Sequence, residues 1–246
     1  MYKGQNVFIK VGDERLKDEA SVLGKVKYKN IPQLIELTNL LDGRFQLIME
    51  LFPGQPLDEY IELDSSWNSR KLPIKEAQAI ITGLVNCLIV LRNKGYLYRD
   101  LNFNHVLIDG ARVSLVDMEA AVKFESQAIW RTNSRTGTWE VMPHEEFRVG
   151  NRLLENAITY SLGVTTLQLA TGSNPFFVSI KQIPNHEVRR VFVRELHKEI
   201  PLIHTSNNSL DAFLAKALQP VPSKRFEKIE DFQSALNNIS FGTGVK

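Results

Sequence analysis

Residues 96–119, YLYRDLNFNHVLIDGARVSLVDME, are the stretch that decides the fold. The pattern predicts two short apolar strands, at 106–108 and 113–116, separated by a turn. Two carboxylates flank these strands: Asp100 lies in the loop before them, and Asp117 ends the second one. Two acidic side chains at the ends of neighbouring elements form a candidate site for chemistry.

Outward from this stretch, the hydrophobic pattern predicts a small mixed lobe followed by a mostly helical lobe. Asp42-Gly43 separates two strand-like runs and tolerates the positive φ of a tight hairpin turn. The expected strands of the first lobe cover 7–10, 34–41 and 45–51, with a helix over 17–26. Later helices are expected at 74–93, 157–170, 187–199 and 210–218. The fold class is therefore α+β, in a single domain with an N-lobe (1–52) and a C-lobe (53–246).

Composition limits the class of protein and the kind of partner. Of the 246 residues, 43% are hydrophobic and 24% are charged, which suits a folded unit rather than a disordered one. A net charge of +2 argues against a nucleic-acid partner, which usually needs a concentrated basic face. We expect no membrane span, and Cys87, the single cysteine, fits a core residue in a reducing compartment. The expected location is the cytoplasm, and the scattered histidines predict no zinc site.

Four charged residues could together serve phosphoryl transfer. This chemistry needs cations near the phosphates, carboxylates that hold a metal ion, and a carboxylate near the attacking hydroxyl. Lys10 ends a predicted strand, Glu19 lies on the next helix, and Asp100 and Asp117 follow later. Each of them alone is more simply explained as a solvated charge. Their order along the chain is therefore more informative than any one of them.

That order, and the residues around it, resemble the protein kinase family. VFIK at 7–10 resembles the strand that ends in the phosphate-binding lysine, and EASVL at 19–23 resembles the helix with the ion-pair glutamate. YRDL at 98–101 resembles the catalytic loop, and VDME at 116–119 takes the place of the metal-binding Asp-Phe-Gly. Further similarities extend over nearly the whole chain, at LIMEL 47–51, GT 137–138, MPHE 142–145, YSLGV 160–164, TGSNPF 171–176 and PSKRF 222–226.

The resemblance is to eukaryotic-like Ser/Thr protein kinase domains, and it implies a bilobal protein-kinase-like fold. Lys10, paired with Glu19, would grip the phosphates of ATP, and Asp100 would orient the attacking hydroxyl. The implied nucleotide-binding residues are Phe8, Lys10, Met49, Glu50, Leu51 and Leu107. The implied Mg²⁺ site contains Asp117, with His105 and Glu119 at neighbouring motif positions. The implied partners are ATP and a protein, which is either a substrate or a regulatory partner.

Several residues depart from the family pattern. No glycine-rich loop is seen before Lys10, where Gly4 is the only glycine. His105 replaces the asparagine that holds a second Mg²⁺, and Glu119 replaces the glycine of Asp-Phe-Gly. A lysine, a helix aspartate and a small residue over the adenine are replaced by Asn102, Ile158 and Phe8, respectively.

Three functions stay open on these residues. The first is an atypical ATP-dependent Ser/Thr protein kinase, in which Thr138 favours Ser/Thr over Tyr. The second is a pseudokinase that binds or regulates a partner without chemistry, as the departures suggest. The third and least supported is a small-molecule phosphotransferase, which normally lacks the segment ending at Glu145 and the later Arg225. The family pattern also implies a mostly buried ion pair between Glu145 and Arg225.

The expected activation segment has two interpretations, which differ in the role of Arg99. Thr132, Ser134 and Thr136 lie beside Arg131 and Arg135 there, and Arg99, next to Asp100, could receive a phosphate added to one of them. An ordinary polar loop explains the same residues equally well.

Overall fold

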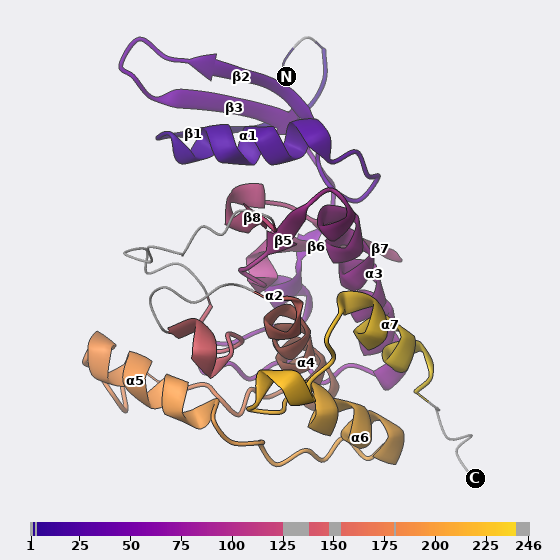
Figure 1. Ribbon diagram of the computed structural model, residues 1–246. Coiled ribbons are helices and arrows are strands. Elements are labelled where there is room, and N and C mark those ends of the chain that lie inside the picture. The colour runs from indigo at the N-terminus through magenta and orange to yellow at the C-terminus, as the bar shows by residue number, and fades with distance from the viewer. Residues whose placement is uncertain (1, 3, 125–137, 148–153, 180, 240–246) are drawn as a thin grey trace.

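An antiparallel sheet packed on one helix forms the upper layer of the molecule (Figure 1). A computed structural model describes residues 2, 4–124, 138–147, 154–179 and 181–239. In the sheet, β3 (Phe45–Glu50) lies between β1 (Val7–Gly12) and β2 (Leu34–Asn39), and α1 (Arg15–Lys25) packs against all three strands. The mixed first lobe that the sequence predicts is confirmed. Lys10 lies on a strand at the edge of the described sheet.

The hairpin between β2 and β3 turns at Asp42-Gly43, as predicted. Gly43 has a φ of +81°, a conformation that residues with a Cβ rarely adopt. The Asp42 side chain accepts a hydrogen bond from the N–H of Arg44 at 3.0 Å. The N–H of Leu40 donates to the carbonyl of Arg44 at 2.8 Å and closes the hairpin. The turn therefore holds β3 in place as the strand on which β1 pairs.

One face of α1 is buried beneath the sheet. Leu16, Ala20 and Leu23 follow the spacing of an amphipathic helix and are all buried. Glu19 lies on the same face and is 0% exposed. A carboxylate in such a position needs a cation and hydrogen-bond donors. α1 therefore places a buried carboxylate, which needs a partner, at the junction of the two lobes.

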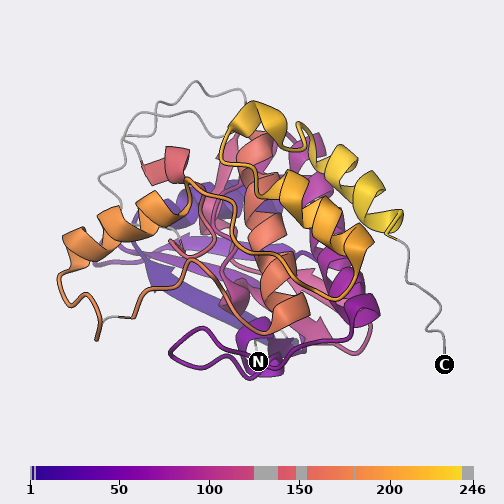
Figure 2. The same ribbon diagram turned by 90° about the horizontal axis from the view of Figure 1, so that it is seen from below.

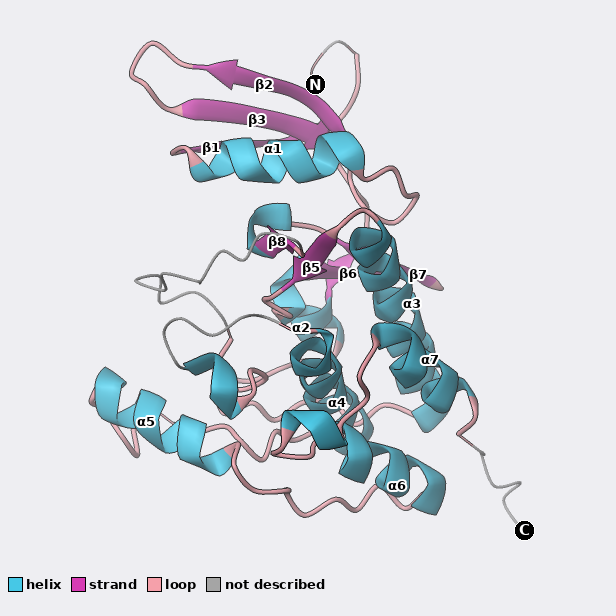
Figure 3. Ribbon diagram, in the orientation of Figure 1, coloured by secondary structure: helices cyan, strands magenta, loops and turns pink. Residues whose placement is uncertain are grey.

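Two short sheets and a long helix, α3 (Ile74–Asn93), begin the lower lobe (Figure 3). The elements of the two sheets are β4 (Gln55–Pro56) with β6 (Val106–Asp109) and β7 (Arg112–Leu115), and β5 (Tyr96–Tyr98) with β8 (Ala121–Lys123). Gly83 of α3 lets β7 come close, since a Cβ at that position would lie 2.6 Å from the Cβ of Val113. The short helices here are α2 (Leu57–Tyr60), η1 (Phe103–His105) and η2 (Met118–Ala120). Because η2 packs against α1, the loop that carries Asp117 meets the upper layer.

Three helices pack around α4 (Glu155–Thr171), which lies near the middle of the lower lobe in the view from below (Figure 2). Every residue of α4 except Asn156 and Thr171 is buried, as expected for a helix enclosed by other helices. Several of its buried hydroxyls donate to carbonyls of the same helix; Thr166, for example, donates to the carbonyl of Leu162 at 2.7 Å. The helices packed on α4 are α3, α6 (Asn208–Ala217) and α7 (Ile229–Asn237). α5 (His186–Leu196) projects from the edge of this lobe in Figure 1.

The long helix α3 corrects one expectation from the sequence. No apolar run of membrane-spanning length was expected, yet α3 is long and apolar enough to cross a membrane by length and composition. In this structure its residues Ile81, Leu84 and Leu88 are buried in the hydrophobic core, together with Cys87. The core assignment of Cys87 is therefore confirmed, and α3 packs here as the core helix of the lower lobe.

Candidate active site

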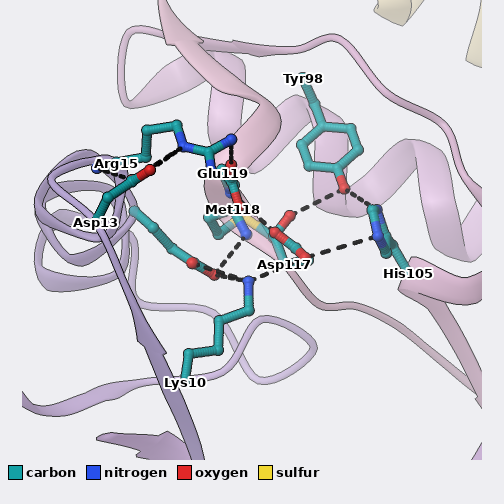
Figure 4. Close-up of polar contacts among 9 residues, drawn as sticks. Lys10, Asp13, Arg15, Tyr98, His105, Asp117, Met118 and Glu119 are labelled. Carbon is teal, nitrogen blue, oxygen red and sulfur yellow. Dashed lines mark hydrogen bonds and ion pairs between the residues drawn. The ribbon is translucent and has the colours of Figure 1, made fainter. Parts of the chain in front are cut away.

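Lys10 connects the two lobes through a pair of carboxylates (Figure 4). Its Nζ lies 3.0 Å from Oε2 of Glu19 on α1 and 2.9 Å from Oδ2 of Asp117. Nζ also donates to Oε1 of Glu19 at 3.3 Å, and the backbone N–H of Met118 donates to the same Oε1 at 3.0 Å, so the buried carboxylate has both a cation and a backbone donor. The predicted pair of Lys10 with Glu19 is confirmed. Asp117, distant in sequence, shares the same ammonium group.

The ionisation of this group of charges follows from burial and from the shared cation. Burial disfavours the charged form of Lys10, but Glu19 and Asp117 outweigh it and raise the pKa of Lys10. Burial raises the pKa of Glu19, and Lys10 offsets only part of this effect. Burial would also raise the pKa of Asp117, but Lys10 reverses this and holds its pKa below the usual range. Asp117 is therefore the carboxylate that stays ionised and can face a metal ion.

The backbone of Asp117 has an unusual conformation that sets the direction of its side chain. Its φ is +66°, in the left-handed region, which aspartate tolerates better than most residues. The hydroxyl of Tyr98 donates to the Asp117 carbonyl at 3.0 Å. Burial raises the pKa of Tyr98 well above its usual range, so this hydroxyl stays protonated. The N–H of Glu119 donates to Oδ1 of Asp117 at 3.1 Å, and Oδ2 faces Lys10.

Asp100, the predicted base, is oriented by Thr138. The Thr138 hydroxyl donates to Oδ1 of Asp100 at 2.9 Å, and the Thr138 N–H donates to the same oxygen at 3.1 Å. Asn102 bonds within the loop, where its side chain accepts a hydrogen bond from the N–H of Asn104 at 3.0 Å. The structure therefore brings Asp100 together with the threonine singled out as a marker of Ser/Thr specificity.

The three expected metal ligands do not form one cluster. Nε2 of His105 lies 3.6 Å from Oδ2 of Asp117, so these two residues are neighbours. Glu119 instead pairs with Arg15 on α1 at 2.9 Å, and Arg15 also pairs with Asp13 at 3.0 Å (Figure 4). Across the described part of the chain, no three His, Cys, Asp or Glu side chains gather into a group that could hold a metal ion. Glu119 thus serves as an exposed contact between α1 and η2.

The residues implied in nucleotide binding occupy both lobes. Phe8 on β1 lies opposite Met49 on β3, and Phe8 is 46% exposed whereas Met49 is 3% exposed. Leu51 is also 46% exposed, while Leu107 on β6 is partly exposed. The N–H of Glu50 donates to the carbonyl of Gln33 at 3.0 Å. Phe8, Leu51 and Leu107 therefore leave apolar surface uncovered. A planar base needs such a surface to pack against.

A second charged pair, which the sequence did not reveal, joins Arg99 to Glu146 on η3 (His144–Phe147). Glu146 lies 3.5 Å from Nε of Arg99, and both side chains are 9% exposed. Burial raises the pKa of Glu146 to about 7, although Arg99 opposes the shift. The residues proposed to offer Arg99 a phosphate, Thr132, Ser134 and Thr136, lie outside the described residues. The adjacent acidic residues at 145–146 were the only sequence signal for this contact.

The predicted ion pair between Glu145 and Arg225 is confirmed. Arg225 donates from Nη1 to Oε1 at 2.5 Å and from Nη2 to Oε2 at 3.0 Å. The Arg225 side chain is 0% exposed and that of Glu145 is 22% exposed. The pair fastens η3 to the segment that follows α6.

Comparison with known proteins shows the family of the chain. The model of the protein kinase domain family matches residues 4–238, and the chain therefore belongs to this family. A probable serine/threonine-protein kinase of Clostridium perfringens is 23% identical over 232 residues, which cover 92% of this chain and 32% of the relative. Human mitogen-activated protein kinase kinase kinase 5 is 27% identical over 216 residues, covering 85% of this chain and 15% of the relative.

A plant protein extends the comparison. A probable L-type lectin-domain containing receptor kinase of Arabidopsis thaliana is 25% identical over 181 residues, which cover 71% of this chain and 27% of the relative. The chain thus spans less than a third of the length of each of these relatives.

Proposed function

We propose that this domain transfers the γ-phosphate of ATP to a serine or threonine hydroxyl of a protein. The observation that carries the proposal is the contact of Lys10 with both Glu19 and Asp117, at 3.0 and 2.9 Å. It assembles, across the two lobes, the cation and the carboxylate that phosphoryl transfer needs. The relatives named as Ser/Thr kinases support the same class of reaction.

Each residue has a definite task in this reaction. Lys10, held by Glu19, neutralises charge on the phosphates, and the ionised Asp117 fits a magnesium ion because hard cations prefer carboxylate oxygens. The metal, when bound, supplies further positive charge at the phosphates. Asp100 accepts a hydrogen bond from the substrate hydroxyl and takes its proton. A new oxygen–phosphorus bond then forms, the bond to the bridging oxygen breaks, and ADP leaves.

Thr138 supports a serine or threonine acceptor. Its hydroxyl bonds to the Asp100 oxygen at 2.9 Å, so a side chain from the substrate-facing segment lies beside the base. A short aliphatic hydroxyl is the group that can reach Asp100 next to this contact, whereas a tyrosine ring needs more room.

A binding module without chemistry is the second candidate, and Asn102 is the observation that favours it. Its side chain caps η1 by accepting a hydrogen bond from Asn104, at the position where the family has a lysine. One cation expected near the transferred phosphate is therefore replaced by a neutral amide.

Transfer of labelled phosphate separates the two candidates. The parent is incubated with γ-labelled ATP, Mg²⁺ and a serine-rich acceptor protein, beside Lys10→Met and a control, Lys27→Met, which changes an exposed lysine. We expect transfer by the parent and the control but not by Lys10→Met. ATP binding without transfer in the parent would establish the binding module instead. Equal transfer by Lys10→Met would refute the proposed site.

A further inference from the structure

We propose that His105 is a nitrogen ligand of the metal ion at this site, and that it makes the site prefer Mn²⁺ or Co²⁺ to Mg²⁺. The inference rests on the proposed nucleotide and metal site and deepens it by naming the class of cation. The position of the His105 ring, its hydrogen-bond partner and the direction of Glu119 carry it (Figure 4).

The backbone holds the imidazole of His105 next to Asp117. His105 ends η1, where its N–H donates to the carbonyl of Asn102 at 3.0 Å. Its own carbonyl accepts a hydrogen bond from the N–H of Val116 at 2.8 Å. Because Val116 directly precedes Asp117, this bond ties the two candidate ligands to each other through the main chain. The ring is therefore placed by the fold rather than by a surface contact.

The hydrogen bonds of Tyr98 determine the tautomer of His105. They decide which ring nitrogen has the free lone pair. The one hydroxyl hydrogen of Tyr98 goes to the carbonyl of Asp117 at 3.0 Å. Nδ1 of His105 lies 3.2 Å from the same hydroxyl oxygen, so Nδ1–H is the donor in that contact. Nε2 then carries the lone pair, on the side of Asp117. Metal-binding histidines are commonly oriented in this way, by a hydrogen bond from the nitrogen that does not bind the metal.

The separation of the two donors suits one shared ion. Nε2 of His105 and Oδ2 of Asp117 are 3.6 Å apart. Two ligands at about 2.1 Å from one ion lie roughly 3.0–3.4 Å apart when the angle between them is octahedral or tetrahedral. A movement of a few tenths of an ångström therefore brings both atoms to ligand distance. The remaining positions are left for phosphate oxygens and water.

The second acidic residue nearby is engaged elsewhere. Glu119 pairs with Arg15 at 2.9 Å, and its N–H occupies Oδ1 of Asp117. Oδ2 of Asp117 faces both Lys10 and His105. His105 is therefore the side chain best placed to act as the second protein ligand.

The chemistry of imidazole leads to the choice of cation. Mg²⁺ is a hard ion that takes oxygen ligands and keeps much of its water. First-row transition metals bind mixed nitrogen and oxygen sites more tightly, and their affinity rises from Mn²⁺ to Co²⁺. Replacing an amide oxygen by Nε2 of His105 therefore lowers the affinity of the site for Mg²⁺ relative to its affinities for Mn²⁺ and Co²⁺.

Calorimetric titration of a non-hydrolysable ATP analogue, with saturating Mg²⁺, Mn²⁺ or Co²⁺, measures this preference without any turnover. His105→Asn restores an oxygen donor, Tyr98→Phe removes the acceptor of Nδ1–H, and His204→Asn changes an exposed histidine as a control. We expect the ratio of affinities with Co²⁺ and Mg²⁺ to fall at least about 10-fold in His105→Asn, because loss of a hydrogen-bond partner of a ligand can already cost about 10-fold in metal affinity. The ratio should fall less in Tyr98→Phe and stay unchanged in His204→Asn.

Pulsed electron paramagnetic resonance of bound Mn²⁺ supplies a direct readout, since a ligated imidazole adds a nitrogen modulation that His105→Asn should abolish. Equal affinity ratios in the parent and His105→Asn, or a parent spectrum without this modulation, would overturn the inference and leave the proposed kinase function intact. A parent that binds the nucleotide with none of the three cations would overturn both.

Discussion

The guanidinium of Arg225 binds both carboxylate oxygens of Glu145, at 2.5 and 3.0 Å, and joins two segments eighty residues apart. The same guanidinium also donates to the carbonyls of Gln219 and Pro220, at 2.6 and 2.8 Å. With a longer contact from Nη1 to the carbonyl of Asn156 at 3.4 Å, all five N–H groups of the guanidinium have an acceptor inside the lower lobe. The contact positions η3, on which Glu146 lies close to Arg99.

Arg225→Ala should destabilise the domain strongly. The variant removes the guanidinium from Glu145 and the donor from the carbonyls of Gln219 and Pro220, and the loss of one partner from a buried pair costs roughly 3–5 kcal/mol. Urea unfolding of the parent and the variant measures the difference. Arg44→Ala, which removes an exposed arginine from the hairpin turn, is the control and should change little. Equal unfolding midpoints for Arg225→Ala and the parent would contradict this role of the pair.

Asp117→Asn and Asp100→Asn should each abolish phosphate transfer, for different reasons. The first removes the ionised carboxylate that faces Lys10 at 2.9 Å and the expected metal site. The second removes the carboxylate proposed to accept the substrate proton, while an asparagine oxygen can still accept from Thr138. Nucleotide affinity should fall mainly in Asp117→Asn, as calorimetry can show. Asp231→Asn, at an exposed site on α7, is the control. Unchanged transfer by either active-site variant would remove that residue from the mechanism.

Glu146 should make the stability of the domain depend on pH. Its pKa is raised from 4.5 to about 7, so between these values the folded state binds more protons than the unfolded state. The stability from Glu146 is therefore fully present below about pH 4.5 and is lost as the pH rises through about 7. The size of the loss is on the order of 3 kcal/mol.

Glu146→Gln tests this dependence, because glutamine cannot titrate. We expect its free energy of unfolding to fall less than that of the parent between pH 5 and pH 8, as urea melts at both values can show. Glu199→Gln changes an exposed carboxylate and should follow the parent. Parallel pH profiles of Glu146→Gln and the parent would mean that the buried carboxylate does not gain a proton on folding.

Phe8→Ala should strengthen ATP binding. The resemblance implies that Phe8 replaces a small residue over the adenine, and extra volume in a close-packed site is unfavourable. Because Phe8 is 46% exposed, removing the ring should cost less stability than a core substitution. Thermal shifts with Mg-ATP report the change, since a ligand at a hundredfold excess over Kd stabilises by about 2.7 kcal/mol. A larger shift in the parent would show instead that the ring stacks on the base.

Local sequence patterns were sufficient to predict the main elements of the fold. The alternation around Lys10, the Asp42-Gly43 turn and the periodicity of α3 all depend on neighbours within a few residues, which a sequence displays directly. The predicted helix at 187–199 ends earlier, at Leu196, and α7 was not predicted. The strands β5 and β8 were also missed, because three residues are too few to show an alternating pattern.

The order of the motifs also singled out Lys10, Glu19, Asp100 and Asp117, and the structure brings Lys10, Glu19 and Asp117 into contact. Their spacing along the chain is a property of the sequence, so the resemblance to a kinase needed no coordinates. The sequence alone could not show where each side chain points. Glu119 was expected near the metal, yet it turns to Arg15, which lies on a helix of the other lobe.

Only the tertiary structure decided the partners of His105 and Glu146. The ring of His105 lies between Tyr98 and Asp117 because η1, β5 and the end of β7 meet there. Glu146 meets Arg99 because the Glu145–Arg225 pair holds η3 against the lower lobe. Electrostatic and hydrogen-bond energies depend on distance in space and on exclusion of water, and both are set by packing between segments that are far apart in the sequence.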